Sequence, residues 1–454
     1  MTRKLLGTLA LSALLGFPAF GKPPVAAKPP LKAKPPVKSP VPASPRQKIF
    51  DIVWRTVRDS HYDPKINGVN WGAARAKYLP RAEKAADTAA FYAVMNEMLG
   101  LLKQSHLGVI PPETVAVTKE IGTAPALPGE TGESGITAQW VENQPVIVRV
   151  EPESAAVAAG VRPGDVVVAI NEKPVKPVLD AILAATPGNH EGENLVAAWS
   201  TLNRFLSGTV GTEYTLTLKD PADVEKAVTI TPREPTAKKE TFGALPPLAA
   251  AVETRTLPGG IGYVRFSIFL LTLSDPVKEA IHGFAASGAP GLVIDLRGNP
   301  GGIGVMASGI GGTLSEKKID FGTMRTRSFP QKFLSYPQEP VYKGKVVILT
   351  DEGSISTSEI MAAGLQEAKR ATVIGRRTAG MVLPSQVVGL PDGGRFQYVF
   401  ADFRTPKGVV LEGRGVIPDI PVALTRATLA ASPTGDPILD AALNYLTPKE
   451  TVQQ

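Results

Sequence analysis

The chain has 454 residues, which is enough for two or three domains, and its lack of cysteine excludes disulfides and thiol chemistry. Its formal net charge is +7, but residues 1–45 hold seven basic side chains and no acidic one. The remaining 42 Lys/Arg and 42 Asp/Glu cancel, so the charge does not favour nucleic-acid binding.

Residues 1–21 have the pattern of a secretory signal peptide. Basic residues 3 and 4 precede an apolar run over 5–17, and Ala19 and Gly21 place small side chains before a cleavage site. The apolar run is short for a membrane span. We therefore expect export, with the mature protein periplasmic or extracellular.

Residues 22–45 are rich in proline and lysine and predict an extended linker that cannot bury a core. We interpret this linker as a solvated spacer. The alternative is that its lysines associate weakly with an anionic membrane or cell wall.

Residues 46–115 predict a helical region, because apolar side chains recur there at helical spacing. The region includes the segment Lys103-Gln104-Ser105-His106-Leu107-Gly108 near its end. A Pro/Gly/Thr-rich stretch follows and marks a boundary before a region of short strands.

The strand region, residues 134–235, resembles a PDZ domain. The resemblance rests on residues 152–174, which include Ala-Ala-Gly-Val-Arg-Pro-Gly-Asp followed by a strand and an Asn turn. PDZ domains add an extended peptide to a sheet and hold its terminal carboxylate in a backbone nest. The resemblance places that nest near Gly135 and Ile136. An insert over 176–207 predicts one or two helices, at 178–185 and 193–206.

Residues 240–430 alternate strands and helices, which predicts a layered α/β domain. We expect strands at 262–266, 291–296 and 345–350. Residues 431–454 form a C-terminal helix and tail, with the helix at 436–446.

The strand at 345–350 runs into Gly353-Ser354-Ile355-Ser356-Thr357-Ser358-Glu359-Ile360, with a helix expected at 360–368. Such a turn presents a hydroxyl at the strand end, facing unpaired helix N–H groups, as a nucleophilic serine requires. Serine and threonine also cap helices, so a purely structural role is the alternative.

Three motifs in the last domain occur in the order found in one family. They are Asp295-Leu296-Arg297-Gly298-Asn299-Pro300-Gly301-Gly302, the Ser354–Ile360 turn, and Leu411-Glu412-Gly413-Arg414-Gly415-Val416-Ile417-Pro418-Asp419. Over residues 46–430 the chain resembles the C-terminal processing (tail-specific) serine peptidases, including their tricorn-core-like branch. The resemblance implies a multidomain protein with a helical N-terminal region, a PDZ-like β domain and an α/β peptidase core.

The resemblance also assigns roles within these motifs. Ser356 matches the nucleophile, and an oxyanion hole would combine the N–H of Gly301 or Gly302 with that of Thr357. Glycine at 301 and 302 suits this role because it lets a backbone donor approach a substrate carbonyl closely.

The general base departs from the commonest pattern of the family. Many members use a lysine, but Met381 stands at that position and cannot accept a proton. Lys369 follows Ser356 too closely in the helix to replace that lysine. The tricorn-like branch instead places a Ser-His pair before the PDZ region and a late glutamate, which match Ser105, His106 and Glu412. In that scheme Ser105 bridges His106 to the glutamate.

The other three histidines, His61, His190 and His282, receive no role, and no zinc-binding spacing occurs. We therefore predict an exported serine endopeptidase that needs no metal or organic cofactor. Its PDZ domain would capture the C-terminal or extended segments of protein and peptide substrates. Two alternatives remain open: a peptide-binding scaffold that lost turnover, with Met381 as the trace of that loss, and a hydrolase acting on another acyl substrate.

Overall fold

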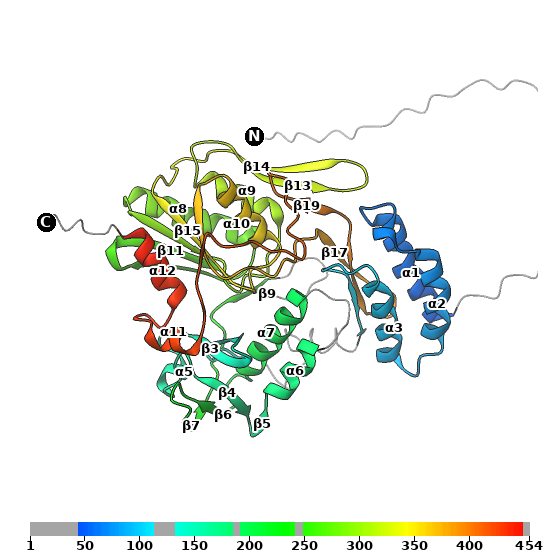
Figure 1. Cartoon of the computed structure of the whole chain (residues 1–454), viewed down its shortest axis with the longest axis horizontal. Helices are drawn as coiled ribbons and strands as arrows, with labels where there is room; N and C mark the ends of the chain where they lie inside the picture. The colour runs from blue at the N-terminus through cyan, green and yellow to red at the C-terminus, as the bar shows by residue number, and fades with distance from the viewer. Residues whose placement is uncertain (1–43, 113–131, 185–190, 241–247, 448–454) are drawn as a thin grey trace, which may run out of the picture. The chain divides into compact units, whose positions relative to one another are not determined.

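The computed structural model describes residues 44–112, 132–184, 191–240 and 248–447 (Figure 1). Along this part of the chain a helical region precedes a PDZ-type sheet and an α/β domain, which confirms the predicted fold class. No helix within these ranges is long and apolar enough to cross a bilayer. The signal-peptide prediction, nearly all of the linker prediction and His190 lie outside the described residues.

The N-terminal region packs its helices around one core. Each α-helix begins at a side chain, Ser44, Asn70 or Asp87, that accepts a backbone N–H of the first turn. Apolar residues at helical spacing, such as Phe50 and Phe91, are buried between the helices. The elements are α1 (Pro45–Ser60), the 3-10 turn η1 (Ile66–Gly68), α2 (Trp71–Glu83), α3 (Thr88–Gly100) and strand β1 (Gly108–Ile110).

Strand β1 joins the helical region to the catalytic region. It pairs antiparallel with β18 (Arg395–Val399), which pairs with β17 (Ser385–Gly389). On α3, the Asn96 side chain accepts the N–H of Val109 at 2.8 Å and donates to the Val109 carbonyl at 3.0 Å. These contacts anchor the segment that directly follows His106.

The PDZ-type region is an antiparallel sheet in the order β2-β3-β4-β6-β7. Helix α7 packs on β2, the edge strand, and the insert contributes Leu179, Leu202 and Leu206 to the buried core. The elements are β2 (Ile136–Val141), β3 (Gln144–Val150), α5 (Ala155–Ala158), β4 (Val166–Ile170), β5 (Lys173–Pro174), α6 (Lys176–Ala184), α7 (Glu191–Ser207), β6 (Tyr214–Lys219) and β7 (Glu225–Ile230).

The α/β domain is built on a six-stranded sheet in the order β10-β11-β12-β15-β16-β20. Only β10 is antiparallel to its neighbour; the other pairs are parallel. The strands are β10 (Val252–Leu257), β11 (Ile261–Phe266), β12 (Gly291–Asp295), β15 (Lys345–Thr350), β16 (Ala371–Gly375) and β20 (Ile420–Pro421).

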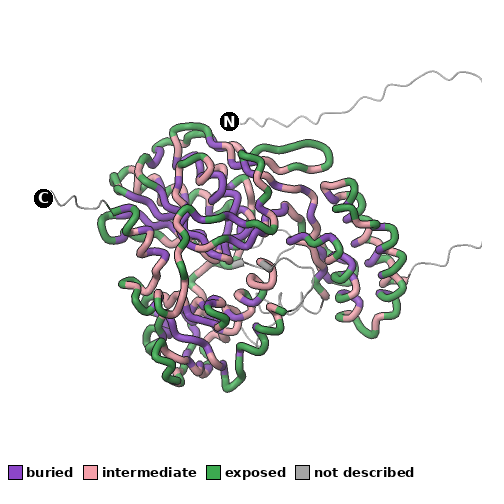
Figure 2. The backbone as a smooth tube through the Cα atoms, in the orientation of Figure 1, coloured by how far each residue is buried: buried purple, intermediate pink, exposed green. Residues whose placement is uncertain are grey.

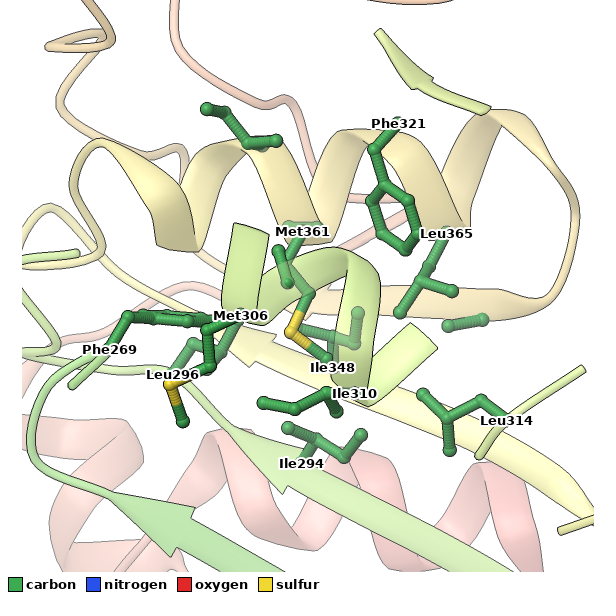
Figure 3. Packing of buried hydrophobic residues seen from close by; sticks show 14 of the residues in the cluster. Phe269, Ile294, Leu296, Met306, Ile310, Leu314, Phe321, Ile348, Met361 and Leu365 are labelled. Carbon is green, nitrogen blue, oxygen red and sulfur yellow. The ribbon is translucent and has the colours of Figure 1, made fainter. Parts of the chain in front are cut away.

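Helices cover both faces of this sheet. Because successive strand residues point to opposite faces, Ile294 and Ile348 pack with α8 (Ser274–Ala286), α9 (Gly304–Gly312) and α10 (Thr357–Glu367), as Figure 3 shows for α9 and α10. Val293 and Val347 pack against α12 (Pro437–Leu446) on the other face. Buried residues follow these strands (Figure 2).

Shorter elements complete the domain. A second sheet joins β14 (Pro330–Ser335), β13 (Ile319–Arg325) and β19 (Asp402–Arg404). The remaining elements are β8 (Lys238–Glu240), β9 (Leu248–Ala250), η2 (Pro258–Gly260), η3 (Leu271–Leu273) and α11 (Arg426–Ala431). The strands expected near 262, 291 and 345 are present as β11, β12 and β15, whereas α10 begins at Thr357, earlier than the predicted helix.

Candidate active site

Ser356 lies at the turn between β15 and α10 in a conformation that few residues adopt. As the N-cap of α10 it has φ 58° and ψ −116°, in the left-handed half of backbone space. Its side chain is half-exposed, whereas Ser354 and Ser358 are buried and donate to the backbone carbonyls of Leu296 and Asn299 at 2.8 and 2.9 Å. Among these three serines, Ser356 alone presents itself to solvent.

The glycine turn lies directly against the serine turn. The Ile355 N–H donates to the Asn299 carbonyl at 3.0 Å, and the Thr357 hydroxyl donates to the Gly302 carbonyl at 2.8 Å. A Cβ atom on Gly301 would lie 2.7 Å from both Ser356 Cβ and Thr357 N. Only glycine fits at position 301 without a shift of the serine turn.

The two glycines expected to supply an oxyanion donor, Gly301 and Gly302, differ in the hydrogen bonding of their N–H groups. The Gly301 N–H already donates to Asn299 Oδ1 at 2.9 Å, so the expectation that it could serve this role does not hold in this state. Within the described part of the chain, the N–H groups of Gly302 and Thr357 have no hydrogen-bond acceptor. Thr357 N–H is one of the unpaired donors at the start of α10.

Glu359 fixes the serine turn to the segment that follows β16. Its fully buried carboxylate accepts the N–H of Ser356 at 3.0 Å, of Gly380 at 2.9 Å and of Met381 at 3.0 Å, as well as the Thr378 hydroxyl at 2.6 Å. Burial raises the pKa of Glu359 to about 7, and these hydrogen bonds oppose the rise.

Ser105, His106 and Glu412 form one hydrogen-bonded chain. Ser105 Oγ lies 2.8 Å from His106 Nδ1 and donates to Glu412 Oε2 at 3.1 Å. The backbone N–H of Ser105 also donates to Glu412 Oε1 at 2.8 Å. Residues about 300 positions apart in sequence thus meet, with Ser105 between the imidazole and the carboxylate.

Two adjacent residues connect this chain to the serine turn. The Val382 N–H donates to Glu412 Oε2 at 3.1 Å, and the Met381 carbonyl accepts the Ser356 N–H at 2.9 Å. In this structure no hydrogen bond joins Ser356 Oγ to the His106 ring. The hydrogen-bonded chain and the serine turn are therefore linked through Glu412, Val382 and Met381.

The surroundings of His106 favour the neutral ring. Burial lowers the pKa of His106 from its ordinary 6.5, and the charge of Glu412 opposes that shift. His106 itself has a positive φ of 57°. The nearby Gln104 is held by His61 Nε2 at 2.8 Å and by the Tyr62 hydroxyl at 2.9 Å, which fixes the loop from behind.

Comparisons with known proteins identify three regions of the chain. Residues 260–422 match the model of peptidase family S41, residues 42–100 the tricorn protease C1 domain and residues 146–190 the PDZ domain. The chain is a serine peptidase with an S41 catalytic domain.

Relatives of the peptidase are named as C-terminal processing proteases or peptidases. A carboxyl-terminal-processing protease of Synechocystis sp. is 28% identical over 88% of this chain and 87% of that protein. A chloroplastic C-terminal processing peptidase of Tetradesmus obliquus is 27% identical over 82% of this chain and 76% of its own length. The peptidase thus falls among carboxyl-terminal-processing proteases with a PDZ domain.

Solved structures share the fold. The photosystem II D1 C-terminal processing protease superposes with a TM-score of 0.56 at 22% identity, covering 87% of this chain and 96% of that one. Mature CPAF gives a TM-score of 0.55 at 16% identity, covering 88% and 95%.

Lys369 does not offer another base near the serine. Met381 contributes backbone groups to the serine turn, as described above. Lys369 lies beyond the C-terminal end of α10 and is exposed, whereas Ser356 caps the other end. At 1.5 Å per residue the two are about 20 Å apart along the helix.

His61 is buried and hydrogen-bonded to Gln104, and we assign it no catalytic role.

The predicted carboxylate nest of the PDZ domain is partly occupied. Gly135 has φ 82°, as a nest-forming turn allows, and a Cβ there would lie 2.2 Å from Ser154 Cβ. The Ile136 N–H, however, already donates to Ser134 Oγ at 3.2 Å. In this state Ile136 therefore has no free N–H to offer a carboxylate, which corrects the prediction at that residue.

Sequence reasoning missed the carboxylates that hold the two turns together. Glu359 could have been found, because Ser356 and Glu359 have the spacing of a capping box. Asp351 gave no such signal, because an aspartate after a strand is ordinary. In the described ranges no group of three or more His, Asp or Glu side chains is placed to hold a metal ion.

Proposed function

We propose that Ser356 is the nucleophile of this peptidase and that His106 is its general base. The observation that carries the proposal is the hydrogen-bonded chain from His106 through Ser105 to Glu412, because Glu412 also accepts the N–H of Val382, the neighbour of the Met381 that binds the Ser356 turn. With Met381 in the position of the family's lysine, the imidazole is the base that the site offers.

The hydrogen bonds assign the protons. Glu412 accepts from the Ser105 hydroxyl, so Ser105 Oγ accepts from His106 Nδ1–H, and the lone pair of the neutral ring is left on Nε2. As Ser356 Oγ attacks the scissile carbonyl, Nε2 takes its proton and then gives it to the leaving amine. The attack requires the ring to approach Ser356, a contact that forms when substrate fills the site.

The developing oxyanion is stabilised by the backbone. The free N–H groups of Gly302 and Thr357 serve as donors, and the N-terminus of α10 adds its dipole. Gly301 contributes by letting the glycine turn pack closely against the serine turn, and its own N–H is not a donor to the oxyanion. Water then attacks the acyl-enzyme at Ser356, with His106 as base again, and releases the product.

The enzyme acts outside the cytoplasm on protein tails. Export follows from the signal-peptide pattern of residues 1–21, with the Lys/Pro linker as a spacer. The PDZ domain captures C-terminal or extended segments and delivers them to Ser356, with Gly135 near the bound end. Carboxyl-terminal-processing proteases among the relatives support this choice of substrate.

A fluorophosphonate probe, which reacts only with activated serines, tests the proposal. Wild type should be labelled, Ser356→Ala should not, and His106→Ala should be labelled much more slowly; digestion of denatured casein should follow the same order. Met381→Lys should be unnecessary for activity. A folded wild type that is never labelled, or cleavage by Met381→Lys alone, would overturn the assignment.

A further inference from the structure

Asp351 ties the serine turn to the glycine turn. It follows β15 and is buried, and its Oδ1 accepts the N–H of Gly298 and the N–H of Gly353, each at 2.9 Å. Gly298 opens the turn that carries Gly302, and Gly353 opens the turn that carries Ser356. One carboxylate oxygen therefore sets the spacing between the proposed nucleophile and an oxyanion donor.

The second oxygen of Asp351 is held from another domain. Gln139, a buried residue of PDZ strand β2, donates from Nε2 to Asp351 Oδ2 at 2.6 Å. Arg376 at the end of β16 donates to Gln139 Oε1 at 3.3 Å, which fixes the orientation of the amide. Gln139 thus completes the hydrogen bonding of the carboxylate that organises both turns.

Four charged groups surround Asp351. Arg297 favours its ionised form, Asp295 disfavours it, and Glu352 on the same turn forms an ion pair with Arg376. Burial raises the pKa of Asp351, so its charge depends on the donors that contact it. Loss of the Gln139 amide would leave a buried carboxylate oxygen without that donor, a costly state.

Helix α7 holds strand β2 in place. The residue before Gln139, Ala138, donates its N–H to Asn203 Oδ1 at 2.9 Å and accepts from Asn203 Nδ2 at 2.8 Å. Asn203 belongs to α7, whose Gly192 approaches Ala379: a Cβ on Gly192 would lie 2.2 Å from the Ala379 carbonyl oxygen. Helix α7 thus contacts β2 near one end and the segment before Met381 near the other.

We propose that Gln139 is a positioning residue for catalysis, through which the PDZ edge strand orients the serine turn and the oxyanion turn by way of Asp351. The inference rests on the proposed role of Ser356. It makes the PDZ domain a structural part of the active site, in addition to any capture of substrate.

The test compares Gln139→Met, which keeps the length of the side chain and removes its amide, with wild type and with Gln144→Met. Gln144 starts β3 in the same sheet, and no side-chain hydrogen bond from it is found in the described residues. Saturation kinetics of fluorophosphonate inactivation separate probe binding from the maximal rate. For Gln139→Met the maximal rate should fall about tenfold or more with little change in half-saturating probe concentration, whereas Gln144→Met should match wild type.

Gln139→Glu distinguishes positioning from simple stabilisation. At low pH the introduced carboxyl is protonated and can donate to Asp351, which restores the missing hydrogen bond, whereas two facing carboxylates repel each other at high pH. The rate of this variant divided by the wild-type rate, which cancels the titration of His106, should therefore fall as pH rises. Melting temperatures confirm that each variant is folded.

Three results decide the outcome. An unlabelled wild type defeats the proposed function itself. A labelled wild type with an unchanged maximal rate in Gln139→Met overturns the role of Gln139 alone. A slow Gln139→Met together with a pH-independent ratio for Gln139→Glu also overturns it, because a merely structural role predicts that pattern.

Discussion

Ser105→Ala is the most direct test of the hydrogen-bonded chain, because it removes one hydroxyl and leaves the loop anchored. The variant loses the contacts to His106 Nδ1 at 2.8 Å and to Glu412 Oε2 at 3.1 Å. Glu412 keeps the backbone N–H of residue 105 at 2.8 Å and that of Val382 at 3.1 Å. The change therefore acts on the orientation and charge of the imidazole rather than on the position of the glutamate.

The expected loss follows from the charge that develops on the ring. A hydrogen bond to a charged group contributes about 1.5–3 kcal/mol, and the ring becomes an imidazolium only during the reaction. Most of this contribution therefore appears in the barrier, which corresponds to a decrease of about one to two orders of magnitude in the maximal rate. Ser105→Thr, which keeps a hydroxyl, should recover much of the activity.

The assay is the maximal rate of fluorophosphonate inactivation, supported by digestion of denatured casein. Ser328→Ala is the matched control, because Ser328 is exposed on the loop between β13 and β14. A Ser105→Ala enzyme as fast as wild type, in a preparation where Ser356→Ala is inert, would show that the bridge does not orient His106.

Two further predictions concern the same centre. The inactivation rate should rise with pH along a limb whose midpoint lies below 6.5, because burial lowers the pKa of His106 and only the neutral ring accepts a proton; a midpoint well above 6.5 would contradict His106 as base. Gly301→Ala should slow inactivation at least tenfold, because its Cβ would lie 2.6 Å from the Ile355 carbonyl oxygen and 2.7 Å from Ser356 Cβ, and overpacking costs about 1–3 kcal/mol. Wild-type kinetics in that variant would refute the close approach of the two turns.

The order of the domains and the residues of the hydrogen-bonded chain could be predicted from sequence because short motifs carry them. Three motifs can be recognised from contiguous residues alone: the Ser-His pair at 105–106, the serine turn and the Leu411–Asp419 motif. The start of α10 was placed too late because Thr357 and Ser358 have weak helix propensity, although the Glu359 hydrogen bond to the Ser356 N–H fixes the first turn.

The contacts between domains could not be predicted. Gln139 and Asp351 are 212 positions apart, and neither residue type is unusual in its segment. Likewise, Asn203 appears in sequence as a polar position on a helix, and only the packing of α7 against β2 brings its amide to Ala138. Such contacts depend on tertiary geometry, which hydrophobic periodicity does not encode.

Capture of a peptide by β2 must compete with Asn203. A strand added at this edge would use the N–H and C=O of Ala138, and Asn203 already occupies both. Displacing the Asn203 amide breaks two hydrogen bonds that contribute about 0.5–1.5 kcal/mol each. The bound peptide replaces the partners of Ala138, but it does not replace those of Asn203. If the freed amide finds no new partner, the affinity falls by roughly 5- to 150-fold relative to an open edge. Capture therefore has to draw its specificity from side-chain pockets or the terminal carboxylate. A bound peptide that replaced Asn203 would still hold β2, and with it Gln139, against Asp351, so occupancy of the groove and alignment of the catalytic turns are compatible.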